Sequence, residues 1–428
     1  MPPLRYDLAF IMISDFTFVH AADIHLDSPL SGLAARDPDF SALVRGATRK
    51  AFANVVDLAI AERAAFVVIS GDLYDGAWKD QSTGQFAVAQ FARLSRAGVR
   101  AFVVYGNHDA ESRITRHLTM PDGVYAFDNR KCEFMTLDDL GVVVHGRSYK
   151  QAATLENIAS EYTPPIRGQF NIALLHTALD GHPGHAAYAP CRLDELRASG
   201  HDYWALGHVH DASVRSEFAH VVFPGNTQGR HVRETGAKGV MVVRVENGQV
   251  KSLEHRPTDE VRWAVAQVDA ANAADMRELL EGVSAALRAS IAGAGARPTA
   301  SRLVVTAAGS LRDRLVADAE WFTSEVIGQA SGVSDLLWIE KIKLVAAKDR
   351  APAGLPSELA ALLAEAINDP DCIRAVAAAV APLVSKLPSD IGDLELTPLL
   401  AVARSGDGRA LVTAARGIVE AHLEGGGD

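Results

Sequence analysis

Residues 100–109 read RAFVVYGNHD, and the composition changes abruptly within them. The first six residues form the short apolar run of a buried strand. The next four place an amide, an imidazole and a carboxylate directly after that strand, at Asn107, His108 and Asp109. A plain turn needs the glycine and at most the asparagine. The histidine and the aspartate therefore indicate chemistry at the end of this strand.

Four other segments share this layout, in which a predicted strand runs into residues that can bind a metal ion. They are ADIHLD (22–27), SGDLYDG (70–76), LLHTALDG (174–181) and ALGHVH (205–210). Strand ends in an α/β sheet lie along one edge, where sites form. Five strand ends can therefore converge although almost 190 residues separate the first from the last.

These segments supply seven candidate ligands with nitrogen or oxygen donors and no thiolate. They are Asp23, His25, Asp72, Asn107, His176, His208 and His210. Taken singly, each has an ordinary alternative, such as a solvated turn or, for His176, a satisfied core histidine. Together they suit Mn²⁺, Fe²⁺ or Zn²⁺ rather than a structural zinc site. Seven ligands fit two ions that share a bridging carboxylate, an arrangement suited to in-line displacement at phosphorus.

The pattern of apolar residues predicts a layered α/β domain over residues 1–257. Helices are expected at 40–63 and 84–96, and strands at 16–21, 65–70, 99–105, 141–145, 170–175, 202–206, 219–223 and 239–245. Alternating strands and helices are typical of βαβ units. A smaller α+β unit is predicted over 258–346, with strands at 263–268, 302–306 and 336–345 and a helix at 271–291. An Ala-, Pro- and Gly-rich linker begins at 347, and residues 357–424 have helical spacing.

Composition narrows the class of protein. The net charge is −11, and residues 1–257 hold 26 Lys and Arg against 29 Asp and Glu. This balance excludes a strongly basic nucleic-acid binder, but not a near-neutral domain whose carboxylates hold metal ions. Of the 15 histidines, 13 precede residue 232, which places the chemistry in the first domain.

The three cysteines are far apart, and no apolar stretch reaches 18 residues. Neither a disulfide framework nor a transmembrane helix is therefore expected, and a cytoplasmic location follows from the reducing compartment. Met12 is an alternative start to Met1.

The motifs D-x-H, GD, GNHD, H and GHxH resemble those of the calcineurin-like metallophosphoesterase superfamily. More narrowly, VHAADIHLD, GDLYD, HTALDG and PGNTQGRHVRETGAKG resemble the SbcD- and YhaO-type DNA repair exonucleases. The resemblance covers residues 18–240. It implies a sandwich of two sheets flanked by helices, followed by a capping domain and a helical C-terminal module. It also implies a DNA exonuclease with two Mn²⁺ ions, an SMC-like coiled-coil ATPase as partner and a possible homodimer.

The resemblance also assigns roles to particular residues. Asp23, His25, Asp72 and His210 would hold one ion, Asp72 would bridge, and Asn107, His176 and His208 would complete the other. His108 would be the catalytic imidazole. Archaeal and eukaryotic relatives have a histidine three residues after the bridging aspartate, where this chain has Asp75. Asp75 is expected to hydrogen-bond His108 at about 2.6–3.2 Å, with Asp109 as the competing partner and capping of the next loop as the alternative role of Asp75.

Other residues have weaker signals. His20 is expected to support the ligands from behind, and His145 to be structural. His182 and His185 are expected on a surface loop, with substrate contact as the alternative. Arg230, His231, Arg233 and Lys238 could contact DNA phosphates or form an exposed basic loop.

Two rival functions remain open. One is another phosphoesterase of the superfamily, such as a protein phosphatase or cyclic nucleotide phosphodiesterase; against the protein phosphatases, Asp75 is followed by Gly76-Ala77 and not by the Arg of GDxxDRG. The other is a non-catalytic DNA-end tether that keeps the fold, against which the intact ligand set and His108 argue.

Deletion of residues 347–428 is expected to leave Mn²⁺-dependent hydrolysis of a small phosphodiester unchanged. The candidate ligands all precede residue 211, and the tail has apolar stripes typical of a helical protein-interaction module. Steady-state rates of the truncated and full chains, with circular dichroism to monitor folding, test this. A truncated chain that stays folded but loses hydrolysis would assign the tail to the active site.

Overall fold

The computed structural model describes most of the chain. The described residues are 13–28, 38–76, 81–111, 119–181, 188–216, 219–347, 357–384, 402–403, 405–413 and 415. Contacts within the chain divide it into two compact units, Met1–Trp263 and Ala264–Asp428.

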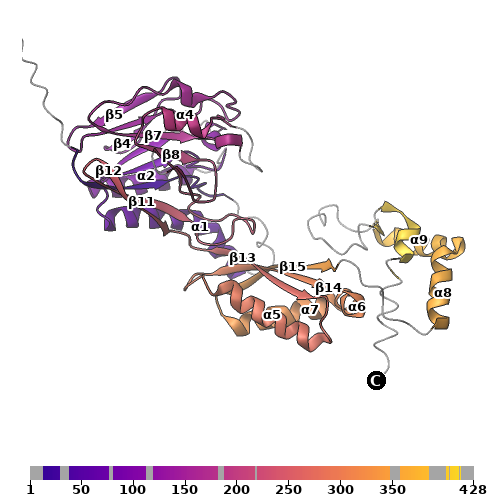
Figure 1. Ribbon diagram of the computed structural model, residues 1–428. Helices are drawn as coiled ribbons and strands as arrows, with labels where there is room; N and C mark the ends of the chain where they lie inside the picture. Colours follow the sequence, from indigo (N-terminus) through magenta and orange to yellow (C-terminus); the bar gives the residue numbers. More distant parts are fainter. Residues whose placement is uncertain are drawn as a thin grey trace, which may run out of the picture. The chain divides into compact units, whose positions relative to one another are not determined.

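The first unit contains two six-stranded sheets (Figure 1). In order across the first sheet, the strands are β12 (Gln249–Pro257), β11 (Gly239–Glu246), β1 (Phe16–Ala21), β2 (Phe66–Ser70), β3 (Arg100–Val104) and β4 (Val124–Ala126). The four strands β1 to β4 run parallel, whereas β11 and β12 are antiparallel additions at one edge.

The second sheet has a parallel centre between two antiparallel edge strands. Its order is β5 (Glu133–Leu137), β6 (Val142–Gly146), β7 (Phe170–His176), β8 (Tyr203–Gly207), β10 (His220–Phe223) and β9 (Ser213–Ser216). Strands β6, β7, β8 and β10 are parallel, and β5 and β9 are antiparallel to their neighbours. Parallel sheets are found where both faces are covered, and both are covered here.

Aromatic side chains fill the space between the two sheets. Phe18 of β1 stacks on Phe66 of β2, with ring centroids 5.2 Å apart, and meets Tyr203 of β8 edge to face at the same distance. All three side chains are fully buried. Since successive residues of a strand face opposite ways, Val19 points to the other face of the sheet and joins a second core.

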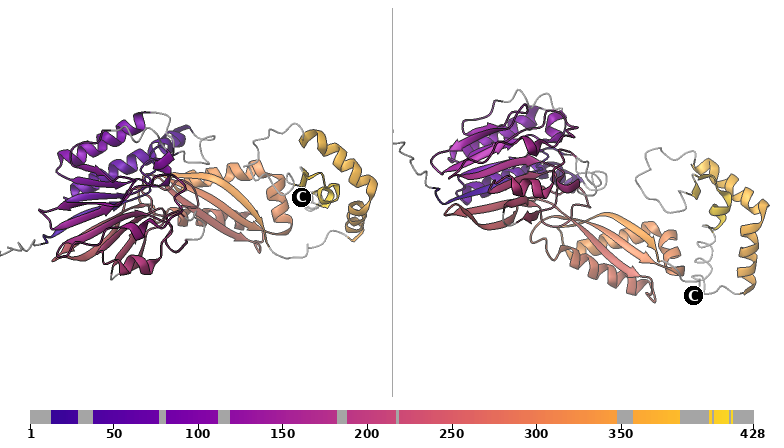
Figure 2. Two further views of the ribbon diagram at one scale, coloured as in Figure 1. Left: turned by 90° about the horizontal axis from the view of Figure 1, so that it is seen from above. Right: turned by 45° about the horizontal axis from the view of Figure 1, so that its top comes forward.

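Helices cover the outer faces of the sandwich (Figure 2). The helices α1 (Pro38–Ala61) and α2 (Gln81–Arg96) pack on the first sheet through residues such as Phe52 and Phe91. On the second sheet, the short α4 (Leu193–Ala198) covers Trp204, whose indole donates a hydrogen bond to the Leu196 carbonyl at 3.0 Å. The chain therefore folds into the expected α/β layers of two sheets flanked by helices.

The second unit contains a three-stranded sheet with helices on it. In sheet order the strands are β13 (Arg262–Ala270), β14 (Thr299–Ala307) and β15 (Leu337–Ala346), and the helices are α5 (Met276–Ile291), α6 (Gly309–Ala317) and α7 (Ala319–Val333). Leu279, Val283 and Leu287 of α5, at helical spacing, face the buried residues of β14. This is a small α+β unit.

Two further helices, α8 (Ser357–Asn368) and α9 (Pro370–Val384), lie in the predicted helical tail. Most of residues 385–424 lie outside the described residues. Within the part of the chain that the structure describes, no helix has both the length and the apolar character needed to cross a membrane.

A pair of buried histidines supports the second sheet away from the predicted metal ligands. His145 of β6 and His201 meet edge to face with ring centroids 4.7 Å apart. His145 also contacts the Thr163 hydroxyl at 2.8 Å and the Asn171 amide oxygen at 3.2 Å. Burial, assisted by His145, lowers the pKa of His201 to about 4. The folded chain therefore holds this ring neutral.

Acid is expected to destabilise the fold through His201. A histidine in the unfolded chain titrates near 6.5. The contribution of the neutral His201 ring to the free energy of unfolding is therefore fully present above pH 6.5, and it is lost as the pH falls from 6.5 toward 4. Between pH 7.5 and 5.0, His201 is expected to account for about 2 kcal/mol of the fall in unfolding free energy. Urea unfolding of chelator-treated wild type and His201→Gln tests this, and an equal pH dependence in both proteins would contradict it.

Candidate metal centre

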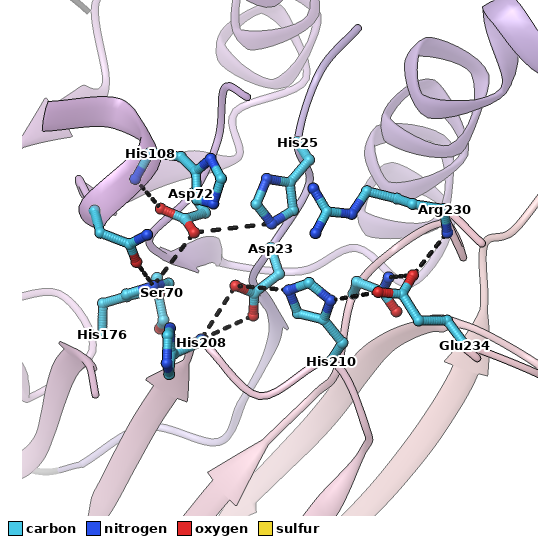
Figure 3. A network of polar contacts seen from close by, with 12 residues as sticks. Asp23, His25, Ser70, Asp72, His108, His176, His208, His210, Arg230 and Glu234 are labelled. Carbon is cyan, nitrogen blue, oxygen red and sulfur yellow. Dashed lines mark hydrogen bonds and ion pairs between the residues drawn. The ribbon is translucent and has the colours of Figure 1, made fainter. Parts of the chain in front are cut away.

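The predicted ligands converge at the carboxyl ends of five parallel strands. Strands β1, β2 and β3 of the first sheet and β7 and β8 of the second all end at this edge. Figure 3 shows the side chains of Asp23, His25, Asp72 and His210 turned toward a common space. The side chains of Asp23, His25 and Asp72 are almost completely buried.

Three imidazoles of the centre are fixed by hydrogen bonds on their Nδ1 side. The pairs are His25 with Asp75 Oδ1 at 3.1 Å, His176 with the Ser70 carbonyl at 2.9 Å, and His210 with Glu234 Oε1 at 2.7 Å. Metal-binding histidines typically donate their second N–H to a carboxylate or a backbone carbonyl in this way. Each ring therefore carries its proton on Nδ1 and has its Nε2 lone pair available for a metal ion.

The surroundings of two Nε2 atoms, those of His25 and His176, suit a cation. Nε2 of His25 is buried and has no hydrogen-bond partner among the described residues. Nε2 of His176 faces two oxygens, Asn107 Oδ1 at 3.0 Å and Asp72 Oδ2 at 3.4 Å. A lone pair that faces oxygen atoms is repelled unless a cation or a proton lies between them. The donor set thus fits divalent cations.

Among the described residues, three groups of ligand atoms are close enough to hold a metal ion, with all atoms of a group within 4.8 Å of one another. The groups are Asp23, His25 and His210; His25, Asp72 and His108; and Asp23, Asp72 and His176. They overlap in both aspartates, as expected for neighbouring ions that share carboxylates. When bound, such ions would neutralise a phosphate and make hydroxide available near neutral pH.

Burial and close charges shift the titration of this cluster. Burial would raise the pKa of Asp72, but the nearby imidazoles of His176, His25 and His108 hold it well below its usual range. Burial would lower the pKa of His176, yet Asp72 and Asp23 raise it to about 9. The site is therefore one in which negative charge from the carboxylates attracts any available cation, whether a proton or a metal ion.

Four predicted ligands have a left-handed backbone. The φ angles are 50° at Asp23, 46° at His25, 52° at Asp72 and 99° at His208. Such values are uncommon outside glycine, although Asp, Asn and His adopt them more readily than other residues. Strained residues of this kind cluster at functional sites because the surrounding structure imposes them.

Two glycines allow the strand ends to approach. A Cβ at Gly71, where φ is +95°, would lie 2.3 Å from Nδ1 of His176. A Cβ at Gly106 would lie 2.4 Å from Asp72 Oδ1. The glycines of GD and GNHD therefore make room for a ligand that belongs to another segment.

His108 lies at the rim of the centre. It belongs to the short helix α3 (Asn107–Glu111), its backbone N–H donates to Asp72 Oδ1 at 3.0 Å, and its side chain is 37% exposed. This exposure sets it apart from the buried ligands. It leaves the ring accessible to a substrate.

The expected partnership of Asp75 with His108 needs correction. His108 Nδ1 lies 3.3 Å from Asp75 Oδ1, just beyond the expected range. The same oxygen is closer to His25 Nδ1 and to the Arg230 guanidinium, both at 3.1 Å. The main contact of Asp75 is therefore with His25, a predicted metal ligand. His108 lies slightly farther from the same oxygen. These contacts outweigh burial and lower the pKa of Asp75 to about 2.

Asp109 does not compete for His108. Its carboxylate accepts the backbone N–H groups of Leu73, Tyr74 and Gly106 at 3.2, 2.8 and 2.9 Å. Burial and the charge of Asp72 raise its pKa to about 7. It thus ties the loop after β2 to the loop after β3, and so holds Asp72 beside His108.

His208 and His20 occupy different positions around the centre. The backbone N–H of His208 donates to both oxygens of Asp23, at 3.1 and 3.0 Å, and its ring centroid lies 5.2 Å from that of His176. Its ring is not part of the three ligand groups. His20 is buried behind them, in contact with the Tyr203 hydroxyl at 3.0 Å and the Ser70 hydroxyl at 3.2 Å.

The basic loop after β10 differs from a simple exposed loop. Arg230 and Lys238 have mostly buried side chains, and Lys238 donates to the His210 carbonyl at 3.0 Å. Arg233 is exposed. Sequence reasoning missed Glu234 altogether, although it stands in the quoted motif HVRE and fixes His210. His182 and His185 lie outside the described residues.

The substitutions Asp72→Asn and His176→Ala are each expected to abolish activity with loss of at least one of the two metal ions. An amide at residue 72 lacks the charge needed to bridge two cations, and removal of the His176 ring takes away an oriented nitrogen. Metal analysis of the purified variants tests this. Asp194→Asn, in which the replaced carboxylate is 77% exposed, is the control. Full two-ion content in Asp72→Asn would contradict the assignment.

Two family models match parts of this chain. Residues 16–212 match the model described as calcineurin-like phosphoesterase, and residues 263–346 match the model described as metallophosphoesterase YhaO, middle domain. A solved structure described as a dimetal phosphatase from Danio rerio aligns with 56% of this chain and 97% of its own, at 14% identity and a TM-score of 0.31.

Curated relatives include two kinds of protein. The "Uncharacterized metallophosphoesterase YhaO" of Bacillus subtilis is 37% identical over 274 residues, which cover 63% of this chain and 67% of that protein. The "DNA double-strand break repair protein Mre11" of Methanopyrus kandleri is 25% identical over 276 residues, and this alignment spans 57% of each chain. The fold, the clustered ligands and the extended similarity to YhaO together show that this chain belongs to the calcineurin-like metallophosphoesterase family.

Proposed function

We propose that this protein is a metal-dependent DNA exonuclease that hydrolyses phosphodiester bonds through a two-metal centre, with Mn²⁺ as the ions. The observation that carries the proposal is the set of imidazoles whose Nδ1 atoms are fixed and whose Nε2 atoms face the carboxylates of Asp23 and Asp72. Two-metal sites of this kind are suited to phosphoryl chemistry.

His108 has the position of a general acid. Asp75 Oδ1 lies 3.3 Å from its Nδ1 and orients the ring. The backbone N–H of His108 is bonded to Asp72, so the residue stays next to the centre whichever way its side chain moves. From the rim, the imidazolium form of His108, with Nδ1–H toward Asp75, would donate its Nε2 proton to the leaving oxygen of a bound phosphate and become neutral.

DNA as the substrate is supported by the similarity to proteins named for DNA double-strand break repair. On that basis we extend the proposal to a role in repair. A cytoplasmic location, an SMC-like coiled-coil ATPase as partner and assembly as a homodimer are parts of the proposal that rest on the sequence motifs and composition alone. A different phosphoesterase activity, on monoesters or cyclic nucleotides, and a non-catalytic DNA-end tether are the alternatives.

Substrate profiles separate these functions. Purified full-length chain with Mn²⁺ is assayed on linear duplex DNA, single-stranded DNA, a bis-p-nitrophenyl phosphodiester and p-nitrophenyl phosphate. Cleavage of DNA ends and of the diester is expected. Hydrolysis of the monoester alone would indicate a phosphatase, and DNA binding without cleavage by the two-metal protein would indicate a tether.

The substitution His108→Gln is expected to lower kcat for DNA by roughly 10²–10⁴-fold, the range for removal of a general acid. Metal content is expected to stay at two ions because the buried ligands remain. An unchanged kcat in a fully loaded His108→Gln protein would refute the role of His108.

A further inference from the structure

Arg230 reaches the metal centre from a distant part of the chain. It lies in the loop that follows β10, and its guanidinium Nη1 is 3.1 Å from Asp75 Oδ1. Figure 3 shows this guanidinium beside the ring of His25, and the same Asp75 oxygen lies 3.1 Å from His25 Nδ1. The Arg230 side chain is only 19% exposed. It is therefore a mostly buried cation at the edge of the ligand cluster.

The loop holds Arg230 rigidly in this position. Glu234 Oε2 accepts the backbone N–H of Arg230 at 2.7 Å and the Asn226 amide at 2.9 Å. The other oxygen of Glu234 accepts Nδ1 of His210 at 2.7 Å. One carboxylate thus fixes both a predicted metal ligand and the backbone of Arg230. The backbone from which the guanidinium extends is therefore fixed by the same carboxylate that orients the ligand.

The hydrogen-bonding capacity of Arg230 exceeds what its surroundings accept. Asp75 Oδ1 is shared among Arg230, His25 and His108, at 3.1, 3.1 and 3.3 Å. Nε of Arg230 is buried and has no hydrogen-bond partner among the described residues. A guanidinium has five N–H donors, and an unmet buried donor is costly. An anion that accepts from Nε and a neighbouring N–H would remove this cost.

Phosphate is the anion that suits this place. The planar fork of arginine matches two oxygens of a phosphate, and the neighbouring cluster is built for phosphoryl chemistry. A substrate carboxylate would match the fork equally well, but it has no role at a two-metal phosphoesterase centre. We propose that Arg230 is a substrate-binding residue that holds a non-bridging oxygen of the phosphate to be cleaved. This inference rests on the proposed phosphoesterase function. It adds the Arg230 guanidinium to the metal ions as a group that binds the substrate phosphate.

A purely structural role for Arg230, as the partner that keeps Asp75 in place, predicts different behaviour. Removal of the guanidinium would then disturb Asp75, and through it His25 and metal binding. A phosphate-binding role predicts full metal content with weaker binding of phosphate. The two roles can therefore be separated by measurements on the same variants.

The experiment compares Arg230→Gln, Arg230→Lys and Arg233→Gln in the full-length Mn²⁺-loaded protein. Arg233 is in the same loop and is exposed, so it controls for loss of one positive charge. Metal content and calorimetric binding of inorganic phosphate, expressed per loaded site, are the primary measurements. KM and kcat for a bis-p-nitrophenyl phosphodiester are the secondary ones.

Arg230→Gln is expected to weaken phosphate binding on the order of 10–100-fold, the range for loss of a hydrogen bond to a charged group. Arg230→Lys is expected to recover part of this affinity because it keeps the charge but not the fork. Arg233→Gln is expected to bind like wild type.

Unchanged phosphate affinity per loaded site in Arg230→Gln would overturn the proposal, whether or not metal content falls. An equal loss in Arg233→Gln would also overturn it, since a diffuse charge effect would then explain both. Phosphate binding is measured without turnover. If wild type fails to hydrolyse any ester, the proposed function fails while the binding test of Arg230 still gives its answer.

Discussion

An imidazole can offer a metal ion only one nitrogen at a time, and the hydrogen bond on its other nitrogen determines which one. In this protein the acceptors for His25 and His176 come from the segment 70–76, as the Asp75 side chain and the Ser70 carbonyl, and the acceptor for His210 is Glu234 in the loop after β10. The centre depends on the docking of the two sheets, because His176 of β7 in the second sheet is held by the Ser70 carbonyl of β2 in the first. Burial of the aromatic side chains between the sheets stabilises that docking and, with it, the orientation of each ring.

Much of this arrangement was predictable from the sequence, and for a simple reason. Buried parallel strands are short apolar runs, and the polar residues that interrupt them at one end mark the edge where the ends meet. The motifs after β1, β2, β3, β7 and β8 were identified in this way, and the structure places their carboxylates and rings together. The exposed edge strand β12 and the short β4, β5 and β9 were not predicted, because half-buried strands have no continuous apolar run. Helices α6 and α7 were also missed.

Other features could not be predicted because they depend on contacts between residues far apart in the chain. Glu234 has no motif of its own, and its role is visible only once the loop after β10 lies against His210. The sharing of Asp75 among three nitrogens follows from the approach of Arg230, which is 155 residues away along the chain. The resemblance to the GDxxD phosphatases indicated that Asp75 is close to His108. It could not show that Asp75 would lie closer to His25 than to His108. The domain limits at 257 and 346 stay predictions of the sequence.

The left-handed backbone at Asp23, His25, Asp72 and His208 has a consequence for descent within the family. At such positions the main chain itself favours Asp, Asn and His over β-branched or bulky residues. Backbone geometry and metal coordination thus select overlapping sets of amino acids. A descendant that had lost its metal ions would remain under pressure to keep residues of these types, so that its turns could still form. The motif residues with a left-handed backbone can therefore persist after catalysis is lost, whereas His108, whose backbone is helical, is not held by this constraint.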